Sequence, residues 1–155
     1  MKVDEKRLKK FEKQLDQLGK TVIQIGAIGD HRPKKKGGKT ISNAALLEIH
    51  EFGLGNNPPR MPIQVAISQS GNLEELKDTL VNLIRVNFKD QQAGFDIDSI
   101  AEGLALKISQ QVKATINSRL SPENKEETVR RKRGDLPLVD TRQLINSIEG
   151  GYYFG

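Results

Sequence analysis

Two short stretches of the chain carry residue types that phosphate-binding and metal-dependent enzymes use. The first, Gly37-Gly38-Lys39-Thr40, is typical of the end of a P-loop and lies between a predicted strand and a predicted helix. A P-loop needs its first glycine five positions before the second, so that backbone N–H groups can surround a phosphate. Pro33 occupies that position and has no N–H group to donate. The stretch therefore does not predict nucleotide binding.

The second stretch, His50-Glu51, begins like the helix of a zinc protease. A zinc protease helix carries its second histidine four residues after the first, and that position is Leu54. His31 is the only other histidine and the chain has no cysteine, so the sequence offers no metal constellation. The carboxylate pairs Glu74-Glu75 and Glu126-Glu127 are typical of solvated faces. We therefore expect no enzymatic activity and no cofactor.

Basic residues gather in two segments that are predicted to be exposed loops. The first spans 30–40, with a hairpin arm as the alternative, and the second spans 121–135. The net charge of the chain is +5. The positive electrostatic field of such clusters attracts polyanions, which means nucleic acid or an acidic protein surface. Two solvated loops without a partner are the alternative interpretation. The basic residues are Lys34, Lys35, Lys36 and Lys39 in the first loop, and Arg130, Arg131, Lys132 and Arg133 in the second.

The composition predicts one soluble domain spanning residues 1–155. With 35% hydrophobic and 29% charged residues, the chain can bury a single aliphatic core and has little surplus apolar surface. The charged N-terminus is unlike a signal peptide, and no apolar run approaches the length of a membrane span. We therefore expect a protein that is cytoplasmic when made and has no membrane partner.

The segment 42–63 is predicted to begin as a short helix. Ser42 or Asn43 can cap its first turn, because either side chain can accept from free N–H groups. Gly53 is the expected end, since glycine readily takes the left-handed conformation that closes a helix. Four apolar residues at three- and four-residue spacing predict one apolar face: Ala45, Leu46, Ile49 and Phe52.

Beyond Gly53 the segment is predicted to be a stiff, extended arm that presents the Arg60 guanidinium. The pair Pro58-Pro59 and Pro62 prevent helix or central strand there. An exposed arm of this kind is expected to contact a partner, and arginine is enriched in such contacts. In the alternative, Phe52 fills the core, which is the interpretation favoured for that residue, and Arg60 only shapes a surface loop. The candidate contacts are Phe52, Pro58, Pro59, Arg60 and Pro62.

Two motifs in the chain are distinctive. The first is HEFG at 50–53, followed by a Gly/Asn loop and PPRMP at 58–62. The second is LPLVDTRQLINSI at 136–148. Together they resemble small tail-completion and neck proteins of tailed bacteriophages, of the lambda-like minor tail protein Z type and the Mu-like virion morphogenesis type. In that family a comparable segment reads Pro-Leu-hydrophobic-Asp-Thr-Gly before a short helix, and Asp140 and Thr141 match it. Arg142 stands where the family usually has glycine, and arginine does not readily take a positive φ.

The resemblance, over residues 42–154, implies a structural virion protein at the head–tail junction. Such a protein completes the tail as a homo-oligomeric ring, a hexamer by analogy, and joins the tail tube protein to the head connector or stopper proteins. Its location would be the virion neck, and the host cytoplasm during assembly. Asp140 and Thr141 would hold the C-terminal turn. The alternative is an accessory protein that binds nucleic acid non-specifically through the two basic loops, including DNA in the channel.

The remaining elements predict an α+β fold, in which a small mixed or antiparallel sheet packs against two long helices. Helices over 72–89 and 97–116 carry regular apolar stripes and form an αα-hairpin, with Asp96 or Asp98 as the cap of the second. Gly103 in the second helix predicts a close helix contact. The tail, 152–154, is predicted to pair as a strand with 21–25, inside a strand over 20–28.

The ends of the chain carry two further predicted helices. Residues 4–18 place Leu8, Phe11, Leu15 and Leu18 on one face of a helix, which is expected to pack on its own domain and not on a neighbouring subunit. A short helix over 142–146 is predicted to be capped by Asp140 or Thr141. Residues 64–68 are predicted to form a short strand or helical turn, and 120–134 a polar loop.

Overall fold

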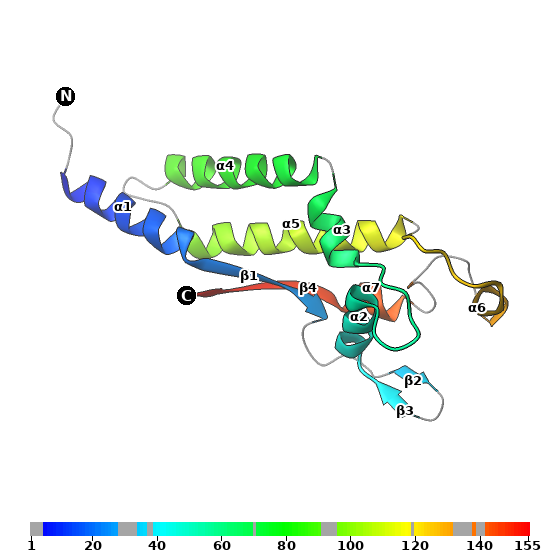
Figure 1. Ribbon diagram of the computed structural model, residues 1–155. Helices are drawn as coiled ribbons and strands as arrows, with labels where there is room; N and C mark the ends of the chain where they lie inside the picture. Colours follow the sequence, from blue (N-terminus) through cyan, green and yellow to red (C-terminus); the bar gives the residue numbers. More distant parts are fainter. Residues whose placement is uncertain are drawn as a thin grey trace.

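The computed structural model describes residues 5–27, 34–36, 39–69, 71–90, 96–118, 120–131, 138 and 142–155, with the backbone alone at 34–36, 39–40 and 87–90. The described chain is α+β, as predicted (Figure 1). Its elements in chain order are α1 Glu5–Gly19, β1 Thr21–Ala27, β2 Lys34–Lys36, β3 Lys39–Ile41, α2 Asn43–Phe52, α3 Pro62–Ser68, α4 Asn72–Asp90, α5 Ile97–Asn117, α6 Glu126–Arg131, α7 Gln143–Ser147 and β4 Ile148–Phe154.

Helix α5 lies at the centre of the molecule, between α4 on one side and the β1–β4 pair on the other (Figure 1). Asp96 caps it, since its Oδ1 accepts hydrogen bonds from the backbone N–H groups of Asp98 at 3.1 Å and Ser99 at 3.4 Å. A Cβ at Gly103 would lie 2.9 Å from Leu83 Cδ1 on α4. The predicted αα-hairpin and its close contact at Gly103 are therefore confirmed.

Strands β1 and β4 form the sheet that covers α5. They run antiparallel, with Thr21 opposite Phe154 at one end and Ala27 opposite Ile148 at the other. A Cβ at Gly150 would overlap the backbone carbonyl of Ala105, so β4 lies directly on the α5 backbone. The predicted pairing of the C-terminal tail with residues 21–25 is confirmed, and the strand begins earlier than predicted, at Ile148.

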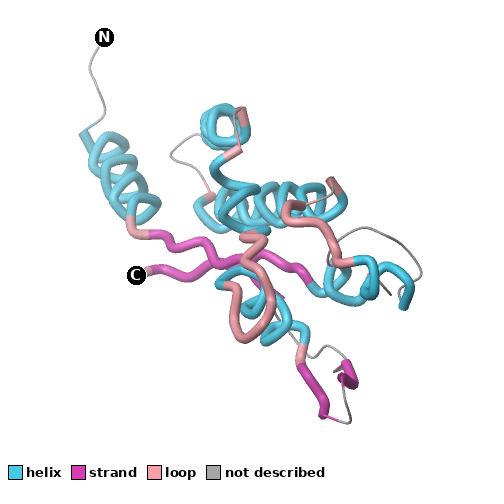
Figure 2. The backbone as a smooth tube through the Cα atoms, turned by 45° about the vertical axis from the view of Figure 1, so that its right-hand side comes forward, coloured by secondary structure: helices cyan, strands magenta, loops and turns pink. Residues whose placement is uncertain are grey.

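Two apolar clusters form the core. The larger joins α2, α3, α5 and α7 through Leu47, Ala66, Val112, Ile116, Leu120, Leu138, Leu144, Ile145 and Ile148. The smaller surrounds Ile97 and Ile100 at the start of α5. Phe11 and Leu18 of α1 pack against this second cluster, whereas Leu8 and Leu15 are exposed. Helix α1 projects from the body in both views, so the predicted packing on its own domain holds for half of its apolar stripe (Figures 1 and 2).

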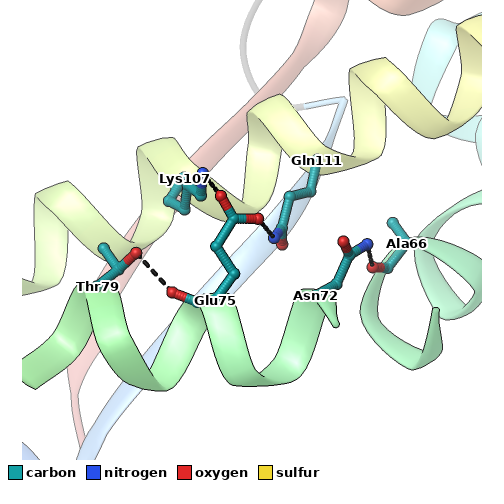
Figure 3. A network of polar contacts seen from close by, with 6 residues as sticks. All are labelled: Ala66, Asn72, Glu75, Thr79, Lys107 and Gln111. Atoms are coloured by element: carbon teal, nitrogen blue, oxygen red, sulfur yellow. Dashed lines mark hydrogen bonds and ion pairs between the residues drawn. The ribbon is translucent and has the colours of Figure 1, made fainter. Parts of the chain in front are cut away.

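A polar network joins α3, α4 and α5 (Figure 3). Glu75 on α4 accepts hydrogen bonds from Lys107 Nζ at 2.5 Å and from Gln111 Nε2 at 3.2 Å, both on α5. The bonds from Lys107 and Gln111 lower the pKa of Glu75 below its ordinary value. Asn72 Nδ2 donates to the carbonyl oxygen of Ala66 at 2.5 Å and so ties α4 to α3. Glu74 and Glu75 are both exposed, as predicted for a solvated face, and Glu75 in addition joins α4 to α5.

Two predicted loops contain regular structure. Strands β2 and β3 pair antiparallel, with Lys36 opposite Lys39, so the hairpin alternative for the predicted loop 30–40 is the correct one. Helix α6 lies inside the predicted loop 121–135, where Glu126 and Glu127 precede Arg130 and Arg131 by one helical turn. Residues 62–68 form a helix, which settles the open alternative at 64–68. Among the helices of the described residues, none is both long and apolar enough to span a membrane.

Candidate interaction surface

Helix α2 forms as predicted at both of its ends. Ser42 Oγ accepts from the backbone N–H of Ala45 at 3.1 Å, and Gly53 closes the helix with φ 69°. Its inward face matches the prediction only in part, because Leu46 packs against the larger cluster but Asn43 and Leu47 are the buried residues and Phe52 is 69% exposed. The favoured interpretation of Phe52 as a core residue is therefore wrong.

The loop after α2 folds back on the helix, so the predicted extended arm is wrong. The backbone N–H groups of Arg60 and Met61 both donate to the carbonyl oxygen of His50, at 2.8 and 3.1 Å. A Cβ at Gly53 would lie 2.6 Å from Pro59 Cδ, so the returning chain requires glycine at this position. The loop thus closes on the C-terminal turn of α2 and satisfies a carbonyl there.

Glu51 holds the start of α3. Its two carboxylate oxygens accept from the backbone N–H groups of Ile63 at 2.9 Å and Gln64 at 3.0 Å. These N–H groups lie in the first turn, where a helix has no internal acceptors and favours negative charge. Pro62 is buried at the first position of α3, where its fixed φ suits the helix. Glu51 therefore links the last turn of α2 to the first turn of α3.

Arg60 points inward, against its predicted role as an exposed contact. The residue is 7% exposed. Its Nε donates to the carbonyl oxygen of Pro122 at 3.0 Å, and its Nη2 donates to Asn124 Oδ1 at 3.3 Å. Nη1 lies 3.3 Å from His50 Nδ1. Burial lowers the pKa of Arg60 below its ordinary value. Arg60 thus joins α2, its own loop and the segment that leads to α6.

An exposed apolar surface remains on the outside of this fixed segment. It consists of Phe52 at the end of α2 and of Leu54 and Met61 in the returning loop. In the same loop, Pro59 is exposed and Pro58 is half-buried. We call Phe52, Leu54 and Met61 the loop surface. Its backbone is held by hydrogen bonds on both sides, so a partner would meet a pre-organised surface.

The described basic residues fall on two structured elements at the end of the molecule that carries α2 and α7 (Figures 1 and 2). Lys34, Lys35, Lys36 and Lys39 all belong to the β2–β3 hairpin. Arg130 and Arg131 lie on α6 and pair with Glu126 and Glu127 at 3.7 and 3.4 Å. These exposed pairs are weak, but they leave α6 without net charge. Lys132 and Arg133 lie outside the described residues.

The C-terminal motif keeps a left-handed backbone where the resembled family has glycine. Arg142 has φ 58° and ψ 7° and directly precedes α7, with no side chain capping the helix there. Leu138, four residues earlier, is buried and also has a positive φ, 63°. Asp140 and Thr141 lie outside the described residues, so their predicted role in the turn stays a prediction. Helix α7 starts one residue later than predicted.

Sequence reasoning did not identify Glu51 as part of this site. Glu51 lies 12 residues before the N–H group of Ile63, and Arg60 lies 62 residues before Pro122. Neither pairing has a fixed sequence spacing. The available signal was the acidic residue in the last turn of α2, where a negative charge is unfavourable unless it has another partner.

The described residues offer contact surfaces, namely the loop surface and the basic elements. Within the described ranges, no group of three or more His, Asp or Glu side chains is placed to hold a metal ion. Comparison of the chain with protein-family models, with curated proteins and with solved structures found no match.

Proposed function

We propose that the chain is a structural protein of a tailed phage that completes the tail at the head–tail junction. In this role it assembles as a ring, joins the tail tube protein to the head connector and resides in the virion neck after assembly in the host cytoplasm. The role is structural and not catalytic. The proposal rests on the resemblance of residues 42–63 and 136–148 to that family.

One observation supports the proposal most directly. The family usually has glycine at the step before the short C-terminal helix, and Arg142 adopts the left-handed conformation that glycine favours. An L-residue takes this conformation at a cost of about 1 to 2 kcal/mol. The backbone at this step is therefore of the kind the resemblance implies, although the side chain departs from it.

The loop surface is the candidate contact with a neighbouring subunit or a tail protein. Phe52, Leu54 and Met61 are exposed on a backbone that Arg60 and Glu51 hold in place. Large apolar side chains on a rigid backbone are typical of the centres of interfaces. Arg60 and Pro62 act in this proposal by positioning the loop surface, since both are buried.

A second candidate function is non-specific nucleic-acid binding through the β2–β3 hairpin. Four lysines on two short paired strands place several positive charges on a small element. Helix α6 supports this function less, because its two described arginines pair with acidic residues on the same helix. A steep loss of DNA affinity with rising salt would favour this function.

Antibody labelling of tailed particles from cells that encode the chain tests the proposed function. We expect label at the junction of head and tail, and rings of defined copy number when the purified chain is imaged. Phe52→Asp should abolish labelling while the free protein stays folded, because the side chain is exposed. Val81→Asp, on the outer face of α4, is the matched control. Particles that contain none of the chain would overturn the proposal.

A further inference from the structure

The outer edge of β4 borders an open groove of about 380 Å³ on α5. The groove is lined by residues of α5 and β4 and by none of β1, so it lies on the side of β4 that faces away from β1. Its α5 side is one helical stripe, consisting of Glu102, Leu106, Ser109 and Lys113. Leu106 is 59% exposed there. The groove therefore combines a strand edge with an apolar side chain beside it.

The hydrogen-bond pattern between β1 and β4 determines which backbone groups of β4 face this groove. Gly155 donates its N–H to the carbonyl oxygen of Lys20 at 3.1 Å, so these two residues form a hydrogen-bonded pair. Bonded and non-bonded pairs alternate along an antiparallel ladder. The N–H and C=O groups of Tyr152 and Gly150 therefore point away from β1, towards the groove. They form a regular row of donors and acceptors for one more strand.

The same alternation leaves a matching row on β1. Thr21 and Ile23 direct their backbone groups away from β4, on the opposite edge of the sheet. Of the described strands, only β1 and β4 belong to this sheet, so each has one edge without a strand partner. Neither strand contains a proline or a break in register, two of the devices that protect an open edge.

We propose that the outer edge of β4 binds the outer edge of β1 from a second copy of this chain. If neighbouring copies are related by a rotation about an axis parallel to the strands, their strands form one antiparallel sheet. In this sheet β1 and β4 of successive copies alternate. The contact is heterologous, since two different edges meet, and it closes into a ring when the rotation closes. Leu106 would cover one face of the added strand.

The distribution of charge favours an antiparallel orientation of the added β1 strand relative to β4. Tyr152 donates a hydrogen bond of 2.7 Å to Asp98, so the end of β4 that leads to the C-terminus lies beside the start of α5. Asp96, Asp98 and Glu102 all raise the pKa of Tyr152, which places three carboxylates at this end of the groove. An antiparallel β1 from a second copy brings its own Lys20 to the same end. Lys20 pairs with Asp16 of its own copy at 2.6 Å, but this pair is exposed and therefore weak, so Lys20 can exchange Asp16 for these carboxylates when the copies pair in this orientation.

The choice of a second copy as the occupant rests on the proposed function, which requires a ring. Other occupants of the groove are outcomes of the test. A β4 edge that pairs with β4 of another copy would give a two-fold dimer, and a strand from a different protein would leave the chain monomeric.

Cysteine cross-linking tests the proposal without interference, because the natural chain has no cysteine. Two mixtures of full-length single variants cover neighbouring registers: Val22→Cys with Tyr153→Cys, and Gln24→Cys with Glu149→Cys. Directly opposite non-bonded residues have Cα atoms about 4.5 Å apart, within disulfide reach. We expect oxidation to link the two partners of at least one mixture.

The single variants and one substitution in the groove complete the design. Tyr153→Cys that cross-links with itself would show a β4–β4 dimer and overturn the proposal, as would a chain that stays monomeric and gives no link in either mixture. Leu106→Arg should abolish the links that occur without unfolding the chain, because the side chain is exposed. Val81→Arg is the matched control and should not change them. Cross-links that persist in Leu106→Arg would show that the added strand does not lie beside Leu106. They would overturn the proposed location of the contact in this groove.

The two proposals can fail separately. Copies that cross-link through β1 and β4 but are absent from tailed particles would overturn the proposed function alone. Particles that contain the chain without such links would overturn the β1–β4 contact alone.

Discussion

Arg60 Nε donates a 3.0 Å hydrogen bond to the carbonyl oxygen of Pro122, which lies 62 residues further along the chain. The same guanidinium donates to Asn124 Oδ1 at 3.3 Å. Residues 120–124 contain no helix or strand, so these bonds are the described polar connection between the α2 loop and the segment that leads to α6. A cation that is buried to make such bonds stabilises the fold strongly only when all its partners are present.

Arg60→Ala is therefore expected to lower the free energy of unfolding by about 1.5 to 3 kcal/mol, the range for hydrogen bonds to charged groups. Arg60→Lys should recover only part of this loss, because an ammonium group cannot reproduce the forked geometry. Urea unfolding measures both. Arg85→Ala, on the exposed face of α4, is the control and should change little. An Arg60→Ala variant as stable as the control would show that the three contacts contribute nothing.

Glu51 gives a second prediction, on the start of α3. Glu51→Ala leaves two first-turn N–H groups without their acceptors and is expected to cost about 1 kcal/mol. Glu51→Gln keeps one acceptor and should cost less. Glu48→Ala, on the exposed face of the same helix, controls for the loss of a carboxylate from α2. If the Glu48 and Glu51 variants unfold at the same urea concentration, the carboxylate does not cap α3.

The long elements could be predicted from the sequence because their signals are local. Helices α4 and α5 carry apolar residues at helical spacing over many turns, and Asp96 marks the start of α5. The β-branched run in β1 and the aromatic tail in β4 indicate strands, and the chain offers few other partners for them. Pattern and packing agree in these elements, so the fold class was predictable.

The loop surface could not be predicted, because tertiary contacts determine it. Prolines and glycines correctly excluded helix and strand from 54–61, but the direction of the loop depends on His50 and Pro122, which no periodicity connects. Phe52 continues the apparent stripe of α2, yet Leu47 faces the core and Phe52 does not. In α6 the signal was present and local, since Glu126 and Arg130 stand four residues apart.

Arg142 gives a third prediction, on backbone strain. Its φ of 58° costs an L-residue about 1 to 2 kcal/mol, whereas glycine adopts it freely and loses part of that gain as chain entropy. Arg142→Gly should therefore raise the free energy of unfolding by about 0.5 to 1 kcal/mol. Arg142→Ala keeps the strain and should give no gain. Thermal and urea unfolding of both variants measure the difference, and a glycine variant no more stable than the alanine variant would contradict the assignment.

Tyr152 gives the last prediction, on the titration of the sheet. The hydroxyl donates to Asp98 Oδ1 at 2.7 Å, and this bond, followed by burial and by nearby carboxylates, raises the pKa of Tyr152 from 10.0 to about 12. Because the folded pKa lies above the unfolded value, the bond contributes its full stability below about pH 10. That contribution is lost as the pH rises towards 12.

Absorbance of the tyrosinate band, recorded with circular dichroism at each pH, follows this titration. We expect a step near pH 12 in the folded protein that Tyr152→Phe removes and that Asp98→Asn shifts to lower pH, since the amide accepts the bond without a charge. Tyr153→Phe is the matched control, because it removes the neighbouring tyrosine and should leave the late step in place. A late step that survives Tyr152→Phe would assign it to another group and contradict the bond between β4 and α5.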